Sequence, residues 1–574
     1  MWLFFNVFDI INTSIPGNFT ELQKCKEVSN MIKRILSILL IAVMLVCTLC
    51  ACGDDDDIAL IMPITSDPLC LDPQIAETET AKTIINNCYE GLVRLDSNHN
   101  ITKGVAESWS VSSDGLTYTF TLRSDTNWQL LKTYSDVLED ENYMENFKTQ
   151  VTAHDFEFAL KRAVDKITDS PDAEKLYCIK NAKKIHSGEA DKSTLGVVAK
   201  DDRTLVITLE RANPDFLRIL TLPLCMPCNE EFFNATGAKY GLELKYTFCN
   251  GPFYLGRWTV DHSLVMYKNE GYKGTVAVKP TSVYLNINKD ESSVITKLKQ
   301  NDYSCAYLSD DSRFSLTDTD ISFEVTENGV SGLAFNCSDT FMSNENLRKA
   351  LVMLTKTDNL KAPDRATGAA GGIIPASCRY ADSSYRQSAG NITKQKYDEN
   401  TALALWKKGL EEIGSDSASV KIVCTDTYSA QMQSIIQNWQ KILSTAIIAK
   451  VEVLSEDELS TAIKNDTYQI AVTEITAKSS SPVDTLDFFT TDNSKNTFNY
   501  SDEEFDTLID KILCECSGDE ILSTIDKAEQ MLIDKAVFLP LFNHGDYLAV
   551  GSETKDVWAM PSFEGVCFIN GGLN

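Results

Sequence analysis

The sequence predicts a layered α/β fold, and three observations support that prediction. In the C-terminal half, segments with helical spacing of apolar residues alternate with short apolar segments typical of strands. Two pairs of β-rich segments with hairpin character precede them, at residues 108–123 and 195–209. The chain has 574 residues, 43% hydrophobic and 24% charged, which is typical of globular proteins with several domain-sized units. Alternation of this kind predicts helices packed on sheets, with ligands bound in crevices at strand ends.

The expected elements follow one another along the chain. A strand at residues 58–63 precedes a helix at 80–92, which we expect to end at Gly91 because glycine is a common helix stop. The hairpin at 108–123 turns at residues 113–115, and a helix at 153–164 has Thr152 as its N-cap. Further strands are expected at 195–199, 204–209, 263–267, 282–287, 333–336, 420–424, 449–454 and 469–472. Further helices are expected at 291–300, 346–355, 401–412, 429–443, 455–464, 502–513 and 520–535.

The charge balance argues against a nucleic-acid partner. The chain has 53 basic and 82 acidic residues and a formal charge of −29. A phosphate backbone would repel such a surface, so we expect no nucleic-acid binding.

The N-terminal region has the layout of a secretion signal. Lys33 and Arg34 follow Met31 and precede an apolar run at residues 35–49, so translation is expected to begin at Met31. Fifteen helical residues span about 22 Å, less than the ~30 Å of a bilayer core, so a permanent spanning helix is the weaker interpretation. The run ends in Leu49-Cys50-Ala51-Cys52, which resembles a bacterial lipobox, and this resemblance predicts lipidation of Cys52 on the extracytoplasmic face of the cell membrane. A chance cysteine after an apolar run is the alternative. Residues 1–51 are thus the upstream extension and signal peptide, and 52–57 an acidic tether.

Residues that would carry out catalysis are sparse. The five histidines have no metal-binding spacing, and nucleophile-elbow, phosphate-loop and dinucleotide motifs are missing from the sequence. His154 and Asp155 are adjacent, but neighbouring side chains on a helix diverge, so a solvated helix start is expected there. Cys225 and Cys228 have the spacing of a redox couple or half a zinc site, but without a second pair they are better explained as structural thiols or a local bridge. We therefore expect no catalytic residue, no metal and no cofactor. A secreted lipoprotein hydrolase is kept as the alternative from a different class.

An ordered set of short motifs resembles the extracytoplasmic solute-binding proteins, family 5, which are the oligopeptide- and dipeptide-binding lipoproteins of ABC importers. The resemblance covers nearly the whole mature chain. The motifs are Leu71-Asp72-Pro73, Tyr89-Glu90-Gly91-Leu92-Val93, Val105-Ala106-Glu107-Ser108-Trp109, Thr119-Phe120-Thr121-Leu122-Arg123, Val151-Thr152-Ala153-His154-Asp155-Phe156, Asn250-Gly251-Pro252-Phe253-Tyr254, Asn346-Leu347-Arg348-Lys349-Ala350-Leu351 and Phe538-Leu539-Pro540-Leu541-Phe542.

The resemblance implies a periplasmic-binding-protein-like clamshell of two α/β lobes with an extra small α+β lobe. Lobe I would comprise residues 58–93, 215–325 and 536–574, the small lobe 94–214, and lobe II 326–535. Closure of the lobes around a peptide, followed by delivery to a membrane permease and its ATPase, is the implied mechanism. The alternative within this fold is a non-peptide solute such as a sugar, a metal chelate or an acidic metabolite.

The resemblance also implies the ligand-binding residues. In such relatives the main chain of the ligand pairs with main-chain groups of the protein, here at Glu77, Thr78 and Glu79 and at residues 474–477, which include Glu474 and Thr476. Phe542 and His544 would form a third wall.

The sequence departs from the family pattern at three places. Residues 129–150 form a longer, acidic insertion, and Ile475 stands where a Trp is usual. Lys478 replaces the Asp that holds the α-ammonium group of the ligand. Because Lys would repel an ammonium group, we expect ligands with a carboxylate or a blocked amine to be preferred.

Overall fold

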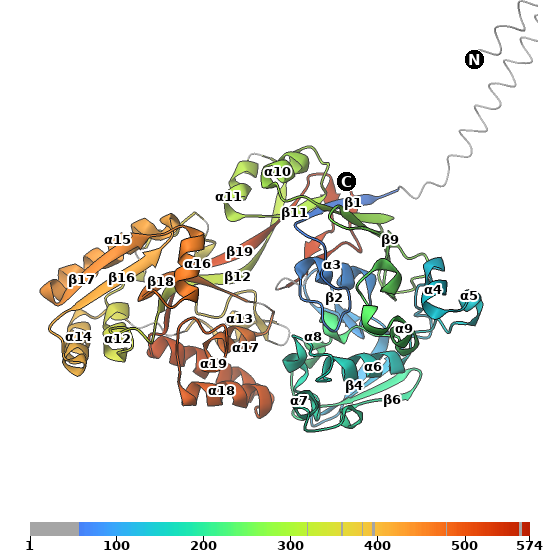
Figure 1. Cartoon of the computed structure of the whole chain (residues 1–574), viewed down its shortest axis with the longest axis horizontal. Coiled ribbons are helices and arrows are strands. Elements are labelled where there is room, and N and C mark those ends of the chain that lie inside the picture. The colour runs from blue at the N-terminus through green and yellow to red at the C-terminus, as the bar shows by residue number, and fades with distance from the viewer. Residues whose placement is uncertain are drawn as a thin grey trace, which may run out of the picture. The chain divides into compact units, whose positions relative to one another are not determined.

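The computed structural model describes residues 57–574, apart from 318, 358–359, 365, 381–382, 393–395, 478 and 562–564. The predicted signal segment and Cys52 lie outside the described residues. Residues Ile58–Asn574 form one compact unit, in which the described residues build two four-stranded sheets and one seven-stranded sheet (Figure 1). The predicted α/β class is confirmed.

The first sheet has the strand order β1-β10-β9-β8, and its strands fall in the ranges expected for lobe I. Strand β1 (Ala59–Ile64) runs parallel to β10 (Ser282–Ile287), and β9 (Ser263–Lys268) pairs antiparallel with both β10 and β8 (Phe253–Thr259). Helix α3 (Glu79–Cys88) packs against β8 and ends one residue before Tyr89, earlier than expected, because the chain turns extended there. Helix α10 (Glu291–Lys299) follows β10 as predicted.

The second sheet forms the small lobe and is antiparallel throughout. Strand β4 (Ala106–Val111) pairs with β5 (Thr117–Leu122), β5 with β7 (Thr204–Thr208), and β7 with β6 (Val197–Asp201), so both predicted hairpins are confirmed. Helix α6 (Ala153–Ala163) packs on this sheet and begins with a capping box between Thr152 and Asp155. Helix α7 (Ala182–Ser187) and the 3₁₀ helix η2 (Ala173–Leu176) connect α6 to β6.

The acidic insertion contains short helices. They are η1 (Lys132–Tyr134), α4 (Ser135–Leu138) and α5 (Tyr143–Asn146). Tyr134 and Tyr143 bury their rings in the same core as lobe I, so the insertion is a packed part of the fold.

The seven-stranded sheet has the order β11-β19-β12-β18-β16-β17, with β13 (Gly368–Ala369) added beside β19. It combines strands from the range expected for lobe II with β11 and β19, which fall in the ranges expected for lobe I. Strands β12 (Ser322–Phe335) and β19 (Phe538–Val550) are the longest described and reach from lobe II to β11 (Cys305–Leu308) beside lobe I (Figure 1). The other strands are β18 (Ile470–Thr476), β16 (Ala418–Cys424) and β17 (Ile447–Val453). The prediction for β12 covered only residues 333–336 and was too short.

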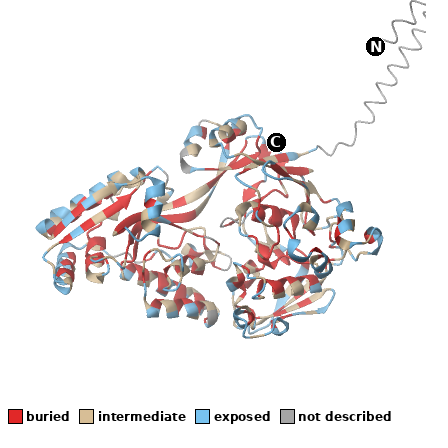
Figure 2. Cartoon of the chain, in the orientation of Figure 1, coloured by how far each residue is buried: buried red, intermediate tan, exposed pale blue. Residues whose placement is uncertain are grey.

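Helices cover both faces of this sheet. One face carries α12 (Glu345–Met353), α14 (Glu399–Ile413) and α15 (Asp426–Leu443), whose apolar residues share a core with Leu333. The other face carries α17 (Pro482–Leu486), α18 (Glu503–Cys514) and α19 (Asp519–Asp534), which share a core with Val330. Neighbouring residues such as Leu333 and Ala334 therefore enter different cores, and β12 is buried throughout from Asn328 to Phe335. Figure 2 colours much of this sheet as buried. Helix α16 (Glu456–Lys464) packs over β16 and β18, where Leu459 shares a small core with Val423 and Ala471.

The remaining described elements are short. The strands are β2 (Val93–Leu95), β3 (Ile101–Lys103), β14 (Arg379–Tyr380), β15 (Ser383–Ser384), β20 (Thr554–Lys555), β21 (Trp558–Ala559), β22 (Val566–Cys567) and β23 (Gly572–Leu573). The α-helices are α8 (Phe216–Ile219), α9 (Glu230–Thr236), α11 (Asp310–Arg313) and α13 (Tyr385–Ala389). Within the part of the chain that the structure describes, helices fall short of the length and apolarity needed to cross a membrane.

Candidate ligand site

The two long strands bring together the predicted site residues of lobe II. Gly329 on β12 stands opposite Thr476 on one side and His544 on the other. Two residues further along, Ser331 stands opposite Glu474 and Phe542. Because side chains two residues apart share a face of a strand, four residues predicted from distant parts of the sequence lie on one face of the sheet.

His544 and Phe542 are buried within that face. His544 Nε2 lies 2.8 Å from Ser331 Oγ and 3.1 Å from the hydroxyl of Tyr428, which lies in the first turn of α15. Phe542 belongs to the apolar core beneath α12, α14 and α15. These two side chains therefore pack the sheet against α15.

Of the four predicted residues on this face of the sheet, Glu474 and Thr476 are the more accessible to solvent. Thr476 Oγ1 lies 3.4 Å from Glu474 Oε1, and a Cβ at Gly329 would overlap the Glu474 carboxylate, which therefore lies over the backbone of β12. Ile475 points the other way into the α17–α19 core, and Ala477, two residues further on, donates its amide to Asn328 O at 2.8 Å. Lys478 lies outside the described residues.

The predicted residues of lobe I lie at the start of α3. Thr78 is the N-cap residue, with an extended backbone, and its hydroxyl accepts from the amide of Ala81 at 3.2 Å. Glu77 is exposed, whereas Glu79 lines a cavity of about 260 Å³ together with Tyr307.

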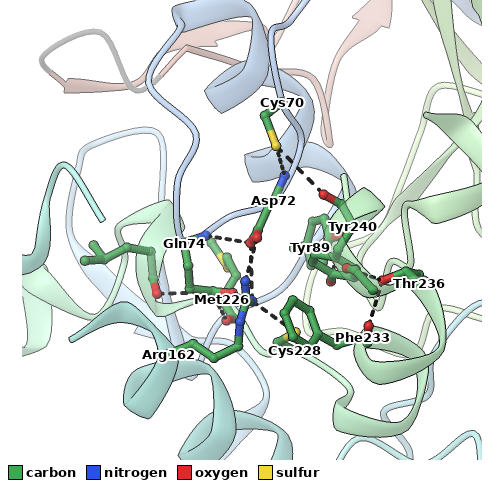
Figure 3. Close-up of polar contacts among 12 residues, drawn as sticks. Cys70, Asp72, Gln74, Tyr89, Arg162, Met226, Cys228, Phe233, Thr236 and Tyr240 are labelled. Atoms are coloured by element: carbon green, nitrogen blue, oxygen red, sulfur yellow. Dashed lines mark hydrogen bonds and ion pairs between the residues drawn. The ribbon is translucent and has the colours of Figure 1, made fainter. Parts of the chain in front are cut away.

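A buried ion pair holds the loop that leads to this segment (Figure 3). Arg162 of α6 donates through Nη2 to Asp72 Oδ2 at 2.6 Å and through Nη1 to Gln74 Oε1 at 2.6 Å. The Phe233 ring stacks 3.9 Å from the guanidinium carbon, and Cys228 Sγ lies 3.4 Å from Nη1. Sequence reasoning used residues 71–73 only as one of the family-like motifs and did not identify the partner of Asp72. The pair fixes lobe I to the small lobe just before residues 77–79.

Asp546 is a residue of the site that sequence reasoning missed. Burial, and then the nearby Asp546 charge, raise the pKa of Glu79 to about 7. Burial also raises the pKa of Asp546, whose carboxylate accepts from the amide of Asn328. The only sequence signal for Asp546 is its position two residues after His544, which places the two side chains on the same face of β19. Two partly buried carboxylates from different segments therefore lie close together where β19 leaves lobe II.

A second cavity, of about 200 Å³, lies beside the same strands. Residues from four stretches of the chain line it: His99, then Glu324, Val325, Thr326 and Glu327 of β12, then Ala376, Ser377 and Arg379, and finally Pro561. Burial and the neighbouring Arg379 and Arg218 charges lower the pKa of His99, so the ring is neutral near pH 7. Sequence reasoning named none of these residues.

The thiols and acids offer no metal centre in the described part of the chain. Groups of three or more potential ligands are absent there. Cys225 and Cys228 are buried free thiols, which agrees with the structural interpretation. Asp155, expected at a solvated helix start, is instead buried in the capping box, and burial raises its pKa to about 6. The expectation holds for His154, whose side chain is 58% exposed, but it was wrong for Asp155, which accepts from the side-chain amide of Asn229 at 3.2 Å.

Two α/β lobes joined by long strands, with a small third lobe, define a solute-binding protein of the clamshell type. Residues 100–497 match the model of the bacterial extracellular solute-binding proteins, family 5, and the chain belongs to that family. The family consists of solute-binding proteins of transporters rather than enzymes, so the hydrolase alternative is removed.

The relatives agree with this assignment. The dipeptide-binding protein DppE of Bacillus subtilis is 27% identical over 86% of this chain and 88% of its own length. The oligopeptide-binding protein OppA of the same organism is 25% identical over 88% of this chain and 91% of its own. The structure of Listeria monocytogenes OppA bound to peptide has a TM-score of 0.64 and 22% identity, covers 90% of this chain and 99% of its own, and supports the fold.

Proposed function

We propose that this chain is the lipid-anchored, peptide-binding component of an ABC importer. It encloses a peptide between lobe I (residues 58–93, 215–325 and 536–574) and lobe II (326–535) and delivers it to a permease and its ATPase. Family membership and the two peptide-binding relatives support this assignment. Residues 94–214 form the small lobe in this proposal.

The observation that carries the proposal is an unpaired strand edge at the site. Strand β18 pairs with β12 over residues 470–476 but with β16 only at Ile470 and Ala471. On the β16 side, no strand among the described residues pairs with 472–476. An extended peptide can add there as a further strand, with Glu474 and Thr476 beside it, and main-chain bonds of this type bind peptides with little regard to side chain.

Lobe I offers a second extended segment for the same ligand. Thr78 has φ −77° and ψ 146°, which is strand-like geometry, and residues 77–79 precede α3 at the acidic pair of Glu79 and Asp546. A peptide that pairs with both segments would lie over the strands that connect the lobes. Phe542 and His544 form the lower wall in this proposal.

A titration tests the proposal directly. We expect pools of synthetic dipeptides to pentapeptides to produce saturable changes in Trp fluorescence of the full chain carrying Cys52→Ala. A parallel chromatographic assay should recover the peptides intact. Saturation by a sugar or a chelate, with no response to any peptide pool, would favour the non-peptide alternative.

The acidic pair predicts a pH-dependent preference for cationic side chains. Glu79 is neutral below its raised pKa of about 7 and ionised above it, so its attraction for a cation grows as pH rises through 7. For a bound tripeptide whose side chain faces Glu79, calorimetry should show several-fold tighter binding of the lysine form than the norleucine form at pH 8, and little preference at pH 6. Glu79→Gln should abolish the difference, whereas the exposed Glu107→Gln should retain it. If Glu79→Gln kept the preference for the lysine form at pH 8, the cationic side chain would bind beside another residue than Glu79.

The anchor is tested separately. Cys52 lies outside the described residues, and its lipidation rests on the lipobox-like sequence Leu49-Cys50-Ala51-Cys52. Replacing Cys52 with Ala should move the protein from the membrane fraction to the soluble fraction, because stable anchoring requires acyl chains. Unaltered fractionation would exclude Cys52 as the anchor.

A further inference from the structure

Two cysteines lie where two distant segments of the chain meet. Cys88 is the last residue of α3, and Cys249 stands four residues before β8. Each directly precedes one of the family-like motifs, at residues 89–93 and 250–254. The main chains touch here, because the Gly251 amide donates to Cys88 O at 2.8 Å and a Cβ at Gly251 would lie only 2.6 Å from the Cys88 carbonyl carbon. Sequence reasoning singled out neither cysteine.

Further hydrogen bonds hold the two segments in place. The Asn250 side chain donates to Glu90 O at 2.9 Å and accepts from Glu90 N at 3.0 Å. The carbonyl of Cys249 accepts from the Gln129 amide at 2.8 Å. The main chain next to each cysteine is therefore fixed relative to the other.

The two thiols lie side by side in the core. Cys88 and Cys249 are both buried, in the cluster that also holds Tyr134. Burial, and then a hydrogen bond with the Cys249 thiol, raise the pKa of Cys88. Burial, and then the nearby Cys249, also raise the pKa of Tyr134, and Cys88 adds to this effect. The two sulfurs thus share one small apolar space.

The compartment of the family favours a bridge between such thiols. Disulfides form and persist in proteins outside the cytoplasm, whereas cytosolic thiols are kept reduced. The chain belongs to the bacterial extracellular solute-binding proteins. A disulfide also requires Cα atoms about 4–7 Å apart, and main chains in contact allow that separation.

We propose that Cys88 and Cys249 form a disulfide bond in the exported protein. The oxidant is a second disulfide, carried by a thiol–disulfide oxidoreductase or a small molecule. One cysteine thiolate attacks it and releases one thiol, and the other cysteine then displaces the second thiol. The cysteines lose two electrons and two protons, and the oxidant gains both as its S–S bond becomes two thiols. The proposal depends on export of the chain and is independent of its ligand.

Burial sets when the bridge can form and what it does. Because thiolates are the reactive species and burial disfavours them, exchange takes place before the core closes around the two side chains. The bridge then ties the end of α3 to the segment that leads into β8, and α3 begins at Glu79 of the candidate site. Protein refolded with this bridge reduced should melt about 5 °C lower than the oxidised protein, because the bridge closes a long loop of the unfolded chain.

Peptide mapping of the protein exported by its own host tests the bridge. Cells are lysed in denaturant with N-ethylmaleimide, which blocks free thiols before they can oxidise. Trypsin releases peptides 83–94 and 246–257, in which Cys88 and Cys249 are the single cysteines. We expect these peptides to be recovered mainly as one cross-linked pair that separates on reduction. Recovery of both with N-ethylmaleimide attached, or a cross-link of either to a different cysteine, would overturn the proposal.

Matched variants separate this pair from other buried thiols. Cys88→Ala should leave peptide 246–257 with N-ethylmaleimide on Cys249. Cys305→Ala, which removes a fully buried thiol of the same core, should keep the cross-linked pair. Because the mapping is done in denaturant, its result does not depend on whether a variant folds fully. Loss of the cross-link in Cys305→Ala, or a cross-linked peptide 246–257 in Cys88→Ala, would contradict the assignment.

Discussion

Replacing Arg162 with Met should lower the free energy of unfolding by about 3–5 kcal/mol, because it leaves the Asp72 carboxylate buried without its charge partner. Methionine fills much of the same volume beside Phe233, so the loss reflects the charge and its hydrogen bonds rather than a cavity. Urea denaturation followed by Trp fluorescence measures the change.

The matched control is Arg203→Met, which breaks an exposed salt bridge to Glu107 of 3.0 Å. Exposed pairs contribute about 0–1 kcal/mol, so this variant should unfold almost as the parent does. The double variant Arg162→Met/Asp72→Asn should recover part of the loss, because no full charge then stays buried. A change below about 1 kcal/mol in Arg162→Met would contradict the structural role of the pair.

The second large effect is expected at Glu529 of α19. Its fully buried carboxylate accepts from the amides of Ile373 and Ile374, at 2.7 and 2.9 Å, and from the Tyr385 hydroxyl and the Arg386 guanidinium. Glu529→Ala leaves the two amides and the hydroxyl without this acceptor and removes the charge partner of the Arg386 guanidinium, which among the described contacts keeps only the carbonyls of Ile374 and Gly390, so it should cost about 3–5 kcal/mol.

The same substitution should weaken ligand binding beyond its effect on folding. The loop held by Glu529 leads to Ser377 and Arg379 in the cavity beside β12, so its release disturbs one wall of the site. Glu520→Ala, which breaks an exposed 2.7 Å pair with Lys511, is the control and should change stability by less than about 1 kcal/mol. Equal free energies of unfolding for Glu529→Ala and Glu520→Ala would show that the buried hydrogen bonds of Glu529 stabilise the protein no more than an exposed salt bridge does.

The sequence predicted most of the elements because periodicity is a local property. Helices α6, α14, α15 and α19 and the β4–β5 hairpin follow apolar spacings that are visible within a dozen residues. Strand β12 was largely missed although Ser322–Glu327 alternates polar and apolar residues as strands do. The turn-like pair Asn328-Gly329 follows directly, and pairing with β19, more than 200 positions away, keeps the strand continuous there. Strand β19 was seen only as a motif at Phe538–Phe542 for the same reason.

The site shows the same division between local and distant information. The resemblance located Glu474, Thr476, Phe542 and His544, which the register then brought onto one face. It did not indicate Asp546, because the contact with Glu79 depends on where β19 passes α3. The resemblance also did not indicate that Asp155 is buried. Asp155 is shielded from solvent by Asn229, a residue from a distant part of the sequence.

Native mass spectrometry of the protein purified from its own host, without added ligand, tests the central claim most directly. A solute-binding protein that encloses peptides should carry a population of bound adducts, and fragmentation of the released molecules should give series spaced by amino-acid residue masses. Recovery of a single non-peptide adduct, such as a sugar or a metal chelate, would contradict peptide binding as the function of this chain.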